Sequence, residues 1–454
     1  SISWTPDSKS LVFWARGQIR RAWLKGDVKT IPFSVKDSRE IRPALRFRVP
    51  VDTDTVPLKM LRWVATSPDG KRVVFEALGK LWVRPTAGGK ATRLTKQNGH
   101  FELMPAWSRD GKRIVYATWH DRLLGTLRVV GVGGGKGKVV TKYPGHYVEP
   151  AFAPNGKSLV YRRVAGGWLR SARWSNKRGV FWLDLQSGKE RRVAHKGSTP
   201  HFGATGERVF LVNHDVSGAG GKEANKLQKL VSVSLKDRRS RVHATSKWAG
   251  AMRVSPNGKW LAFQERFHVF VQPFSATGRP LVLSHNSRAW PTVKVSTDAG
   301  DFLHWSGDSR AIHWALGPKL FSRALDDAFA VLHDAGDIAD KSTLERGAKP
   351  APSVEIGFSV PAPRHTATGA IVGAQIVTMN GKRVIPNGTI TWRGERIVAV
   401  GKVGEVKVAA GAKVFNGKGL TVIPGFVDVH AHGAQASSGI TPQQNWGSLS
   451  MMSF

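Results

Sequence analysis

Thr66-Ser-Pro-Asp-Gly-Lys71 is the stretch that decides the fold, because close copies of it recur along the chain. Five further clear copies occupy residues 4–9, 107–112, 152–157, 254–259 and 305–310, and a degraded copy occupies 202–207. Measured between their Asp, Asn or Thr anchors, successive copies lie 41 to 52 residues apart after a first step of 62. A period of about 40–50 residues is typical of β-propellers, in which each repeat forms one four-stranded blade.

The chemistry of the repeat supports this interpretation. Proline fixes φ, Asp or Asn caps its own backbone, and Gly accepts a positive φ, so each copy predicts a tight turn. Short apolar strands follow the turns, as in Val73-Val74-Phe75 and Leu261-Ala262-Phe263. The motif resembles the propeller repeat of the TolB family. We therefore expect a mainly β chain with a six- or seven-bladed propeller over residues 1–335.

The pattern changes after the propeller. Residues 336–368 mix charge, proline and small residues without periodicity, which predicts a linker. Residues 369–422 then show short apolar runs separated by turn residues, including an Asn380-Gly381 hairpin signal. We expect a small β-sandwich-like domain here. It resembles the small β-domain that precedes the barrel in many amidohydrolases.

A second motif follows directly, in Pro424-Gly-Phe-Val-Asp-Val-His-Ala-His432. A short strand from Phe426 to Val429 would deliver His430 and His432. Alternate residues of a strand face the same way, so both imidazoles could reach one metal ion. The motif resembles the end of the first barrel strand in the amidohydrolase superfamily. Residues 423–454 would then begin a (β/α)8 barrel that is truncated here, since such a barrel needs about 250 residues.

The amidohydrolase resemblance implies a metal-dependent hydrolase. It places a divalent metal, zinc before other ions, on His430 and His432, with Asp428 hydrogen-bonded beneath the metal. A purely structural Asp428 is an equal alternative. Catalytic residues and the other ligands are not identifiable, so we expect this fragment to be inactive alone. The implied reaction is hydrolysis of amide or other C–N bonds in cyclic amides, dipeptides or related small molecules.

A non-enzymatic alternative stays open. The propeller could be a binding module for a protein, a peptide or a polyanionic partner, or it could meet a separate chain that supplies the missing barrel. A propeller centre can gather side chains from several blades into a site, although ordinary hydrogen-bonded histidines are the simpler interpretation. The histidines near the predicted blade strands are His100, His146, His201, His304 and His313.

Composition limits the remaining classes. The chain has 69 basic and 32 acidic residues, a net charge of +37, and residues 350–454 hold only 9 and 4 of them. We favour a solvated basic surface over a nucleic-acid interface, because the basic residues are dispersed. The chain has no cysteine, so it has no disulfides or thiolate metal sites. No Gly-x-Ser-x-Gly elbow supports a serine hydrolase, no apolar stretch is long enough for a membrane span, and the family resemblance favours a periplasmic or secreted location.

Overall fold

The computed structural model describes residues 2–42, 53–164, 177–214, 227–287, 290–333, 350–430 and 442–444. The chain divides into two compact units, residues 1–53 and 54–454, which are described separately. The structure is mainly β, with strand making up 51% of it. Within the described ranges there is a single helix, α1 (Leu325–His333), and no helix long and apolar enough to cross a membrane.

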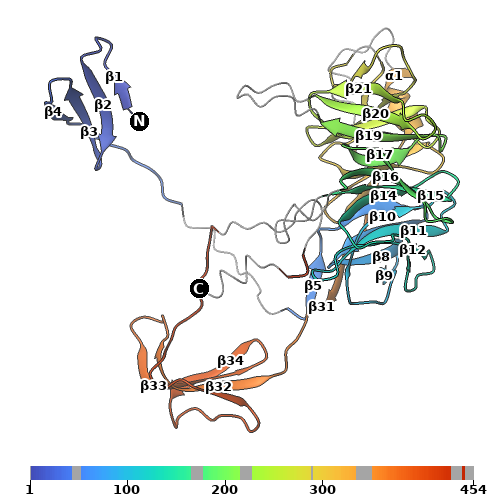
Figure 1. Cartoon of the computed structure of the whole chain (residues 1–454). Coiled ribbons are helices and arrows are strands. Elements are labelled where there is room, and N and C mark those ends of the chain that lie inside the picture. The colour runs from blue at the N-terminus through green and yellow to red at the C-terminus, as the bar shows by residue number, and fades with distance from the viewer. Residues whose placement is uncertain are drawn as a thin grey trace. The chain divides into compact units, whose positions relative to one another are not determined.

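The second unit contains six blades, each a sheet of four sequential strands in antiparallel pairs (Figure 1). Blade 1 has β6 (Arg62–Thr66), β7 (Arg72–Ala77), β8 (Lys80–Pro85) and β9 (Thr92–Arg93). Blade 2 has β10 (Phe101–Trp107), β11 (Arg113–Trp119), β12 (Leu127–Gly131) and β13 (Lys138–Val139). Blade 3 has β14 (Tyr147–Phe152), β15 (Ser158–Arg163), β16 (Gly179–Asp184) and β17 (Glu190–Ala194).

Blades 4 and 5 show small departures from this plan, and blade 6 follows it. Blade 4 has β18 (Ser198–Phe202), β19 (Arg208–His214), β20 (Gln228–Ser234), β21 (Ser240–Ser246) and a parallel fifth strand, β25 (Leu281–Val282). Blade 5 has β22 (Ala249–Val254), β23 (Trp260–Glu265), β24 (His268–Pro273) and β26 (Val293–Lys294). Blade 6 has β27 (Asp301–Trp305), β28 (Ala311–Leu316), β29 (Lys319–Ala324) and β30 (Ser353–Glu355).

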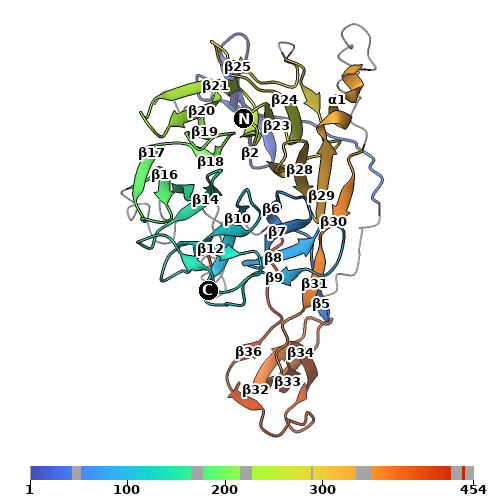
Figure 2. The same cartoon turned by 90° about the vertical axis from the view of Figure 1, so that its right-hand side faces the viewer.

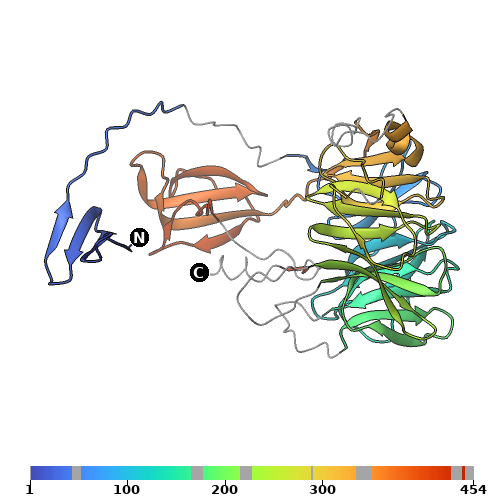
Figure 3. The ribbon, with the colours of Figure 1, turned by 90° about the horizontal axis from the view of Figure 1, so that it is seen from above.

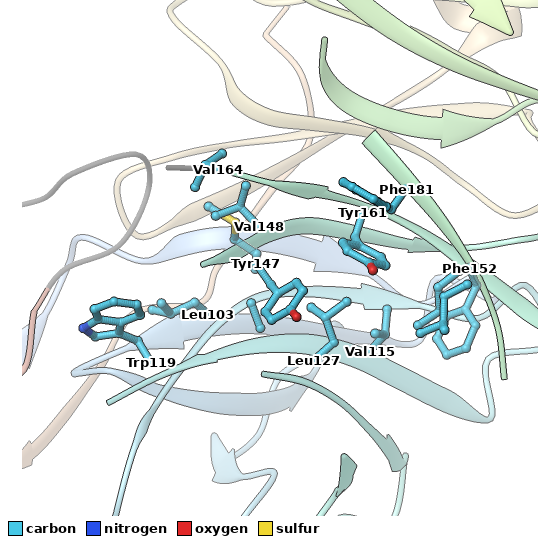
Figure 4. Close-up of a cluster of buried hydrophobic side chains, with 14 residues drawn as sticks. Leu103, Val115, Trp119, Leu127, Tyr147, Val148, Phe152, Tyr161, Val164 and Phe181 are labelled. Atoms are coloured by element: carbon cyan, nitrogen blue, oxygen red, sulfur yellow. The ribbon is translucent and has the colours of Figure 1, made fainter. Parts of the chain in front are cut away.

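The six blades close into a ring, and Figure 2 shows them arranged around a common centre. A separate buried apolar cluster fills each of the six interfaces between neighbouring blades, including the one between blades 6 and 1. Between blades 2 and 3, for example, Leu103 and Leu127 pack with Tyr147, and all three side chains are at most 2% exposed (Figure 4). Hydrophobic burial between blades therefore stabilises the ring.

Short elements complete this unit. The strand β5 (Thr55–Leu58) pairs with β31 (Phe358–Pro361). Phe358 lies 4.7 Å, centroid to centroid, from the Trp82 ring of blade 1. The strands β30 and β31 fall within the stretch that the sequence predicts to be a linker. The sequence does not predict these two strands, because each is only three or four residues long and lies in a polar, proline-rich stretch.

The first copy of the repeat belongs to the first unit and is not one of the six blades of the ring. Residues 4–9 belong to a four-stranded sheet in the first unit: β1 (Ile2–Trp4), β2 (Ser10–Ala15), β3 (Gln18–Trp23) and β4 (Val28–Ile31). The ring therefore has six blades, and the first copy of the repeat forms a separate sheet.

The small β-domain is a single sheet, whereas the sequence led us to expect a sandwich-like arrangement. Its strands are β34 (Arg396–Lys402), β33 (Val384–Arg393), β32 (Thr368–Val377) and β35 (Lys413–Asn416), with β36 (Thr421–Val422) also paired to β32 (Figure 3, orange). Its core is small and centres on Ile376, Ile385 and Ile390. The outer strands leave apolar side chains exposed, among them Ile397 at 67%.

The predicted barrel strand is not formed. Residues 423–428 have no regular secondary structure, and the Phe426 and Val429 side chains are 94% and 95% exposed. A parallel barrel strand takes its hydrogen bonds from neighbours on both sides, and no described strand pairs with this segment. The barrel beginning at residue 423 is therefore not shown. Beyond it, Gln443 and Gln444 donate backbone hydrogen bonds to Asp121 at 3.0 Å each.

Candidate ligand-binding channel

A cavity of about 330 Å³ lies at the centre of the ring. It is lined by the innermost strand of every blade, namely β6, β10, β14, β18, β22 and β27, together with residues of the repeat turns such as Pro68 and Arg109. Closure of the ring thus creates one cavity to which all six blades contribute lining residues.

The innermost strands share a backbone irregularity that shapes this cavity. Each one shifts its register against the second strand of its blade. At five of these shifts a non-glycine residue has a positive φ of 49–56°: Trp63, Met104, Glu149, Thr199 and Phe302. β-Bulges of this kind re-aim the side chains that follow them.

The residue immediately before each repeat copy lines the channel, and its identity differs between the two halves of the ring. Blades 1, 2 and 3 supply Ala65, Ala106 and Ala151. Blades 4, 5 and 6 supply His201, Arg253 and His304. The channel therefore has an apolar wall and a polar wall.

His304 connects blade 6 to blade 1. Its Nδ1–H donates to the Phe302 carbonyl at 2.7 Å, and its Nε2 accepts the Thr66 backbone N–H at 2.8 Å. Burial, with smaller contributions from His313 and Arg253, lowers the pKa of His304 to about 3. The imidazole is therefore neutral at pH 7, and both nitrogens are committed to structure.

His201 repeats this arrangement between blades 4 and 5. Its Nδ1–H donates to the Thr199 carbonyl at 2.9 Å, and its Nε2 accepts the Val254 N–H at 3.1 Å. Burial, and then the charge of Arg253, lowers its pKa to about 3. Neither channel histidine has a free nitrogen for a metal or for proton transfer.

Arg253 is the charged residue of the polar wall, and its side chain is partly buried. Its Nη1 donates to the Thr199 carbonyl at 3.3 Å, and burial lowers the pKa of the guanidinium. Glu149 also lies in the lining, but its Oε1 is paired with Arg162 at 2.8 Å and its Oε2 accepts the Thr199 N–H. Among the carboxylates in the described ranges, none forms an ion pair with Arg253.

A second guanidinium lies at the turn end of the channel. Arg109, in the repeat turn of blade 2, donates to the carbonyls of Gly203 and Ala204 in blade 4. Burial lowers its pKa as well. The channel lining therefore contains two arginines and one carboxylate, Glu149, whose charge acts on Arg253 as well as on Arg162, so the lining carries a net positive charge.

The other histidines named from the sequence do not join this site. His100, His146 and His313 are absent from the cavity lining. Over the described part of the chain, no group of three His, Asp or Glu side chains could hold a metal ion.

The structure describes only one of the two predicted metal ligands. His430 lies in a turn, and its backbone N–H donates to Asp428 Oδ1 at 2.9 Å, which gives Asp428 a local structural contact. His432 lies outside the described residues. Zinc binding by His430 and His432 therefore stays a prediction.

Sequence reasoning found the two channel histidines and missed Arg253 and Glu149. No motif marks either residue. A usable signal did exist, since the position before each repeat copy is a channel position in all six blades. Glu149 lines the channel because it lies at the β-bulge of its strand, and the sequence does not predict that bulge.

No protein-family model matches the chain. TolB from Acinetobacter baumannii is similar at 15% identity and a TM-score of 0.38, over 66% of this chain and 63% of that one. Oligogalacturonate lyase from Vibrio parahaemolyticus is similar at 8% identity and a TM-score of 0.41, over 69% of this chain and 84% of that one. The tricorn protease is similar at 11% identity and a TM-score of 0.43, over 78% of this chain and 39% of that one. The chain thus spans under two thirds of that TolB structure, and its structural neighbours are TolB-like propeller proteins.

These neighbours correct one prediction. The sequence motif at residues 424–432 led us to expect an amidohydrolase-superfamily enzyme. The similar structures are mainly TolB-type propellers, some of them enzymes, and they give no evidence for an amidohydrolase. The assignment as a metal-dependent amidohydrolase is wrong on this comparison. It rested on a nine-residue motif whose predicted strand is not formed.

Proposed function

We propose that the propeller is a binding module whose channel takes a carboxylate carried by a peptide. The observation that supports this is Arg253, a partly buried cation in the channel wall that feels the charge of Glu149 but forms no ion pair with a described carboxylate. Burying an unpaired charge is costly, and a ligand carboxylate would offset that cost. A guanidinium also matches the geometry of a carboxylate with two parallel hydrogen bonds.

The shape of the channel narrows the ligand. A volume of about 330 Å³ lies at the lower end of small-ligand sites, so it suits a side chain or a chain end rather than a folded domain. The apolar wall of Ala65, Ala106 and Ala151 can contact the aliphatic part of that ligand. The proposal therefore concerns an acidic peptide segment. A periplasmic or secreted location stays a prediction.

The test compares two peptides that differ only in charge. Calorimetric titration of the full chain with Ac-Ala-Glu-Ala-NH2 should show binding that the glutamine peptide lacks. Replacing Arg253→Gln should weaken the glutamate peptide about tenfold or more, because hydrogen bonds to charged groups contribute about 1.5–3 kcal/mol. The matched control is Arg310→Gln, an exposed arginine in a repeat turn.

Once circular dichroism shows that each variant is folded, the binding results support or contradict the proposal directly. Equal affinity for both peptides would overturn the proposal. So would unchanged binding by Arg253→Gln, or an equal loss in Arg310→Gln, because the second result would indicate attraction by the general positive charge. If Arg253→Gln does not fold, Arg253→Lys keeps the charge and should retain part of the selectivity for glutamate.

A further inference from the structure

Two loops beside blade 2 present converging polar atoms outside the channel lining. Asp121 lies in the loop that joins β11 to β12, and it belongs to the same compact unit as Gln443 and Gln444. Its Oδ1 accepts the Gln443 backbone N–H and its Oδ2 accepts the Gln444 backbone N–H, both at 3.0 Å. Successive backbone N–H groups are a recurrent way of binding an anion. One carboxylate thus holds the backbone of two consecutive residues.

The Gln443 side chain is bound at both ends of its amide. Its Oε1 accepts the backbone N–H of Asp121 at 3.2 Å, and its Nε2 donates to the Gly99 carbonyl at 3.3 Å. The protein atoms fix these roles, because a backbone N–H donates and a carbonyl accepts. A glutamate in the same place would set an acceptor against the Gly99 carbonyl and a negative charge beside Asp121. The two contacts therefore select glutamine over glutamate.

The ring itself orients the Asp121 carboxylate. Trp119 packs in the buried cluster between blades 2 and 3, and its Nε1 donates to Asp121 Oδ1 at 2.8 Å. Between these two residues, His120 Nδ1 accepts the backbone N–H of Arg122 at 3.1 Å, which holds the loop in shape. Both contacts lie within blade 2, so the carboxylate is in position before any segment binds to it.

The loop that carries Gly99 is fixed in a similar way. The Gln97 side chain spans this loop, since its Nε2 donates to the His100 carbonyl at 3.2 Å and its Oε1 accepts the His100 N–H at 3.1 Å. Lys80 Nζ donates to the same carbonyl at 2.7 Å. The acceptor for a glutamine amide is therefore also held by residues of the ring.

We propose that Asp121 and Gly99 form a peptide-docking site, here called the glutamine site, and that the Gln443-Gln444 segment of the same chain is its ligand. The ligand class is a glutamine followed by a residue with a backbone N–H, which excludes proline. The site is separate from the channel of the proposed function, whose lining contains neither Asp121 nor Gly99. A segment tethered in the same chain acts at an effective concentration on the order of millimolar, so a separate peptide must exceed that concentration to displace it.

Two neighbouring glutamines provide a matched test. The Gln443 side chain makes both amide contacts, whereas Gln444 is exposed and its described contact is its backbone N–H. The chain has no cysteine, so a nitroxide can be attached at Asn445→Cys alone. Its electron paramagnetic resonance spectrum should contain an immobile component in the labelled full chain, and Gln444→Glu should preserve that component. Gln443→Glu adds the same charge one residue away and should lower the ratio of immobile to mobile label about tenfold, because it sets an acceptor against the Gly99 carbonyl.

A separate peptide tests the ligand class. Ac-Pro-Gln-Gln-NH2 at about 10 mM exceeds the effective concentration of the tethered segment, so it should convert most of the immobile label to the mobile form. Ac-Pro-Glu-Gln-NH2 at the same concentration should leave the spectrum unchanged. Circular dichroism should be the same for both glutamate variants, since neither residue belongs to a blade.

Each other outcome overturns the proposal. A label that is fully mobile without either glutamate substitution means that the segment is not docked. An equal loss in Gln443→Glu and Gln444→Glu would show that added charge, and not the Gln443 amide, decides the binding. An immobile label that survives Gln443→Glu, or that the glutamine peptide does not release, is held by contacts other than those with Asp121 and Gly99.

Discussion

The sheet β1–β4 and blade 5 are built from the same sequence repeat, but they belong to different units, and blade 5 packs between blades 4 and 6 of the ring. Both have the repeat turn, in which the Asp7 or Asn257 side chain accepts the backbone N–H of the lysine two residues later. Both then continue into a Leu-x-Phe strand. Phe263 is 0% exposed in blade 5, whereas Phe13 remains partly exposed in the separate sheet. The repeat therefore determines the blade, and the adjoining sheets determine its burial.

This difference separates two sources of stability. Turn capping and strand pairing act within one sheet and are present in both places. In the ring, apolar side chains are also buried between neighbouring blades, so that the surfaces of both blades are removed from water and the ring is stabilised. Substitutions at equivalent positions should therefore have unequal costs, and the inequality measures the contribution of the neighbours.

The largest contrast is expected at the central phenylalanine. Phe263→Ala should lower the free energy of unfolding of the ring by about 3–5 kcal/mol, because it leaves a cavity among fully buried side chains. Phe13→Ala should leave the ring unchanged, since Phe13 belongs to the other unit. Urea unfolding, with hydrogen exchange to distinguish the two units, measures both. Equal losses of ring stability in the two variants would show that the units unfold together.

The second contrast is expected in how the stability of each unit depends on pH. The folded pKa of His304 is lowered to about 3, whereas in the unfolded chain its pKa is about 6.5. Below pH 6.5 the unfolded chain takes up a proton that the ring does not. Ring stability should therefore fall as pH falls towards 4, by about 1.4 kcal/mol per pH unit for this histidine. His304→Gln should reduce that slope.

Other groups modify the same profile. His201 acts in the same direction as His304, because burial lowers its pKa to about 3. Glu76 opposes them: burial raises its pKa to about 7, so its contribution to stability is lost as pH rises from about 4.5 to 7. Residues 2–42 contain no histidine, so the sheet β1–β4 should lack the histidine-dependent slope. Hydrogen exchange at pH 7 and pH 5 checks this, and a parallel loss in both units would contradict it.

The same contrast explains how far the sequence could be read. Turn chemistry and period are local, so the repeat predicts every blade, and Asn380-Gly381 marks the hairpin of the small domain. The number of blades in the ring depends on which copies pack together, and the copy at residues 4–9 looks like the others in sequence. Only part of the channel lining could be predicted from the sequence. His201 and His304 stood out as residue types, whereas Arg253 acquires meaning only when six strands converge.

The predicted strand at the barrel entry does not form, for a related reason. A strand needs hydrogen-bonding partners as well as a suitable sequence, and no described strand pairs with residues 423–428. A motif of nine residues cannot supply them. Repeats supply their own partners, which is why the propeller prediction was the stronger of the two.

The smallest contrast should appear at the hairpin glycines that follow the second strand of each sheet. Gly17 and Gly79 have φ values of 74° and 70°, a region that glycine occupies without strain. Alanine at either position should cost about 1 kcal/mol from the backbone alone. At Gly17 an added Cβ meets nothing within 4 Å, but at Gly79 it would lie 2.4 Å from Cδ1 of Phe101, in the next blade.

Gly79→Ala should therefore destabilise its unit by about 1 kcal/mol more than Gly17→Ala destabilises the separate sheet. The excess is at the lower end of overpacking costs, because the Phe101 ring is only half-buried and can rotate away. Urea unfolding of the ring and hydrogen exchange at residues 10–23 measure the two losses. Phe101→Ala removes the clash and provides the control: in that background the two substitutions should cost the same. If the excess persists without Phe101, it comes from the hairpin itself, and the neighbouring blade is not its source.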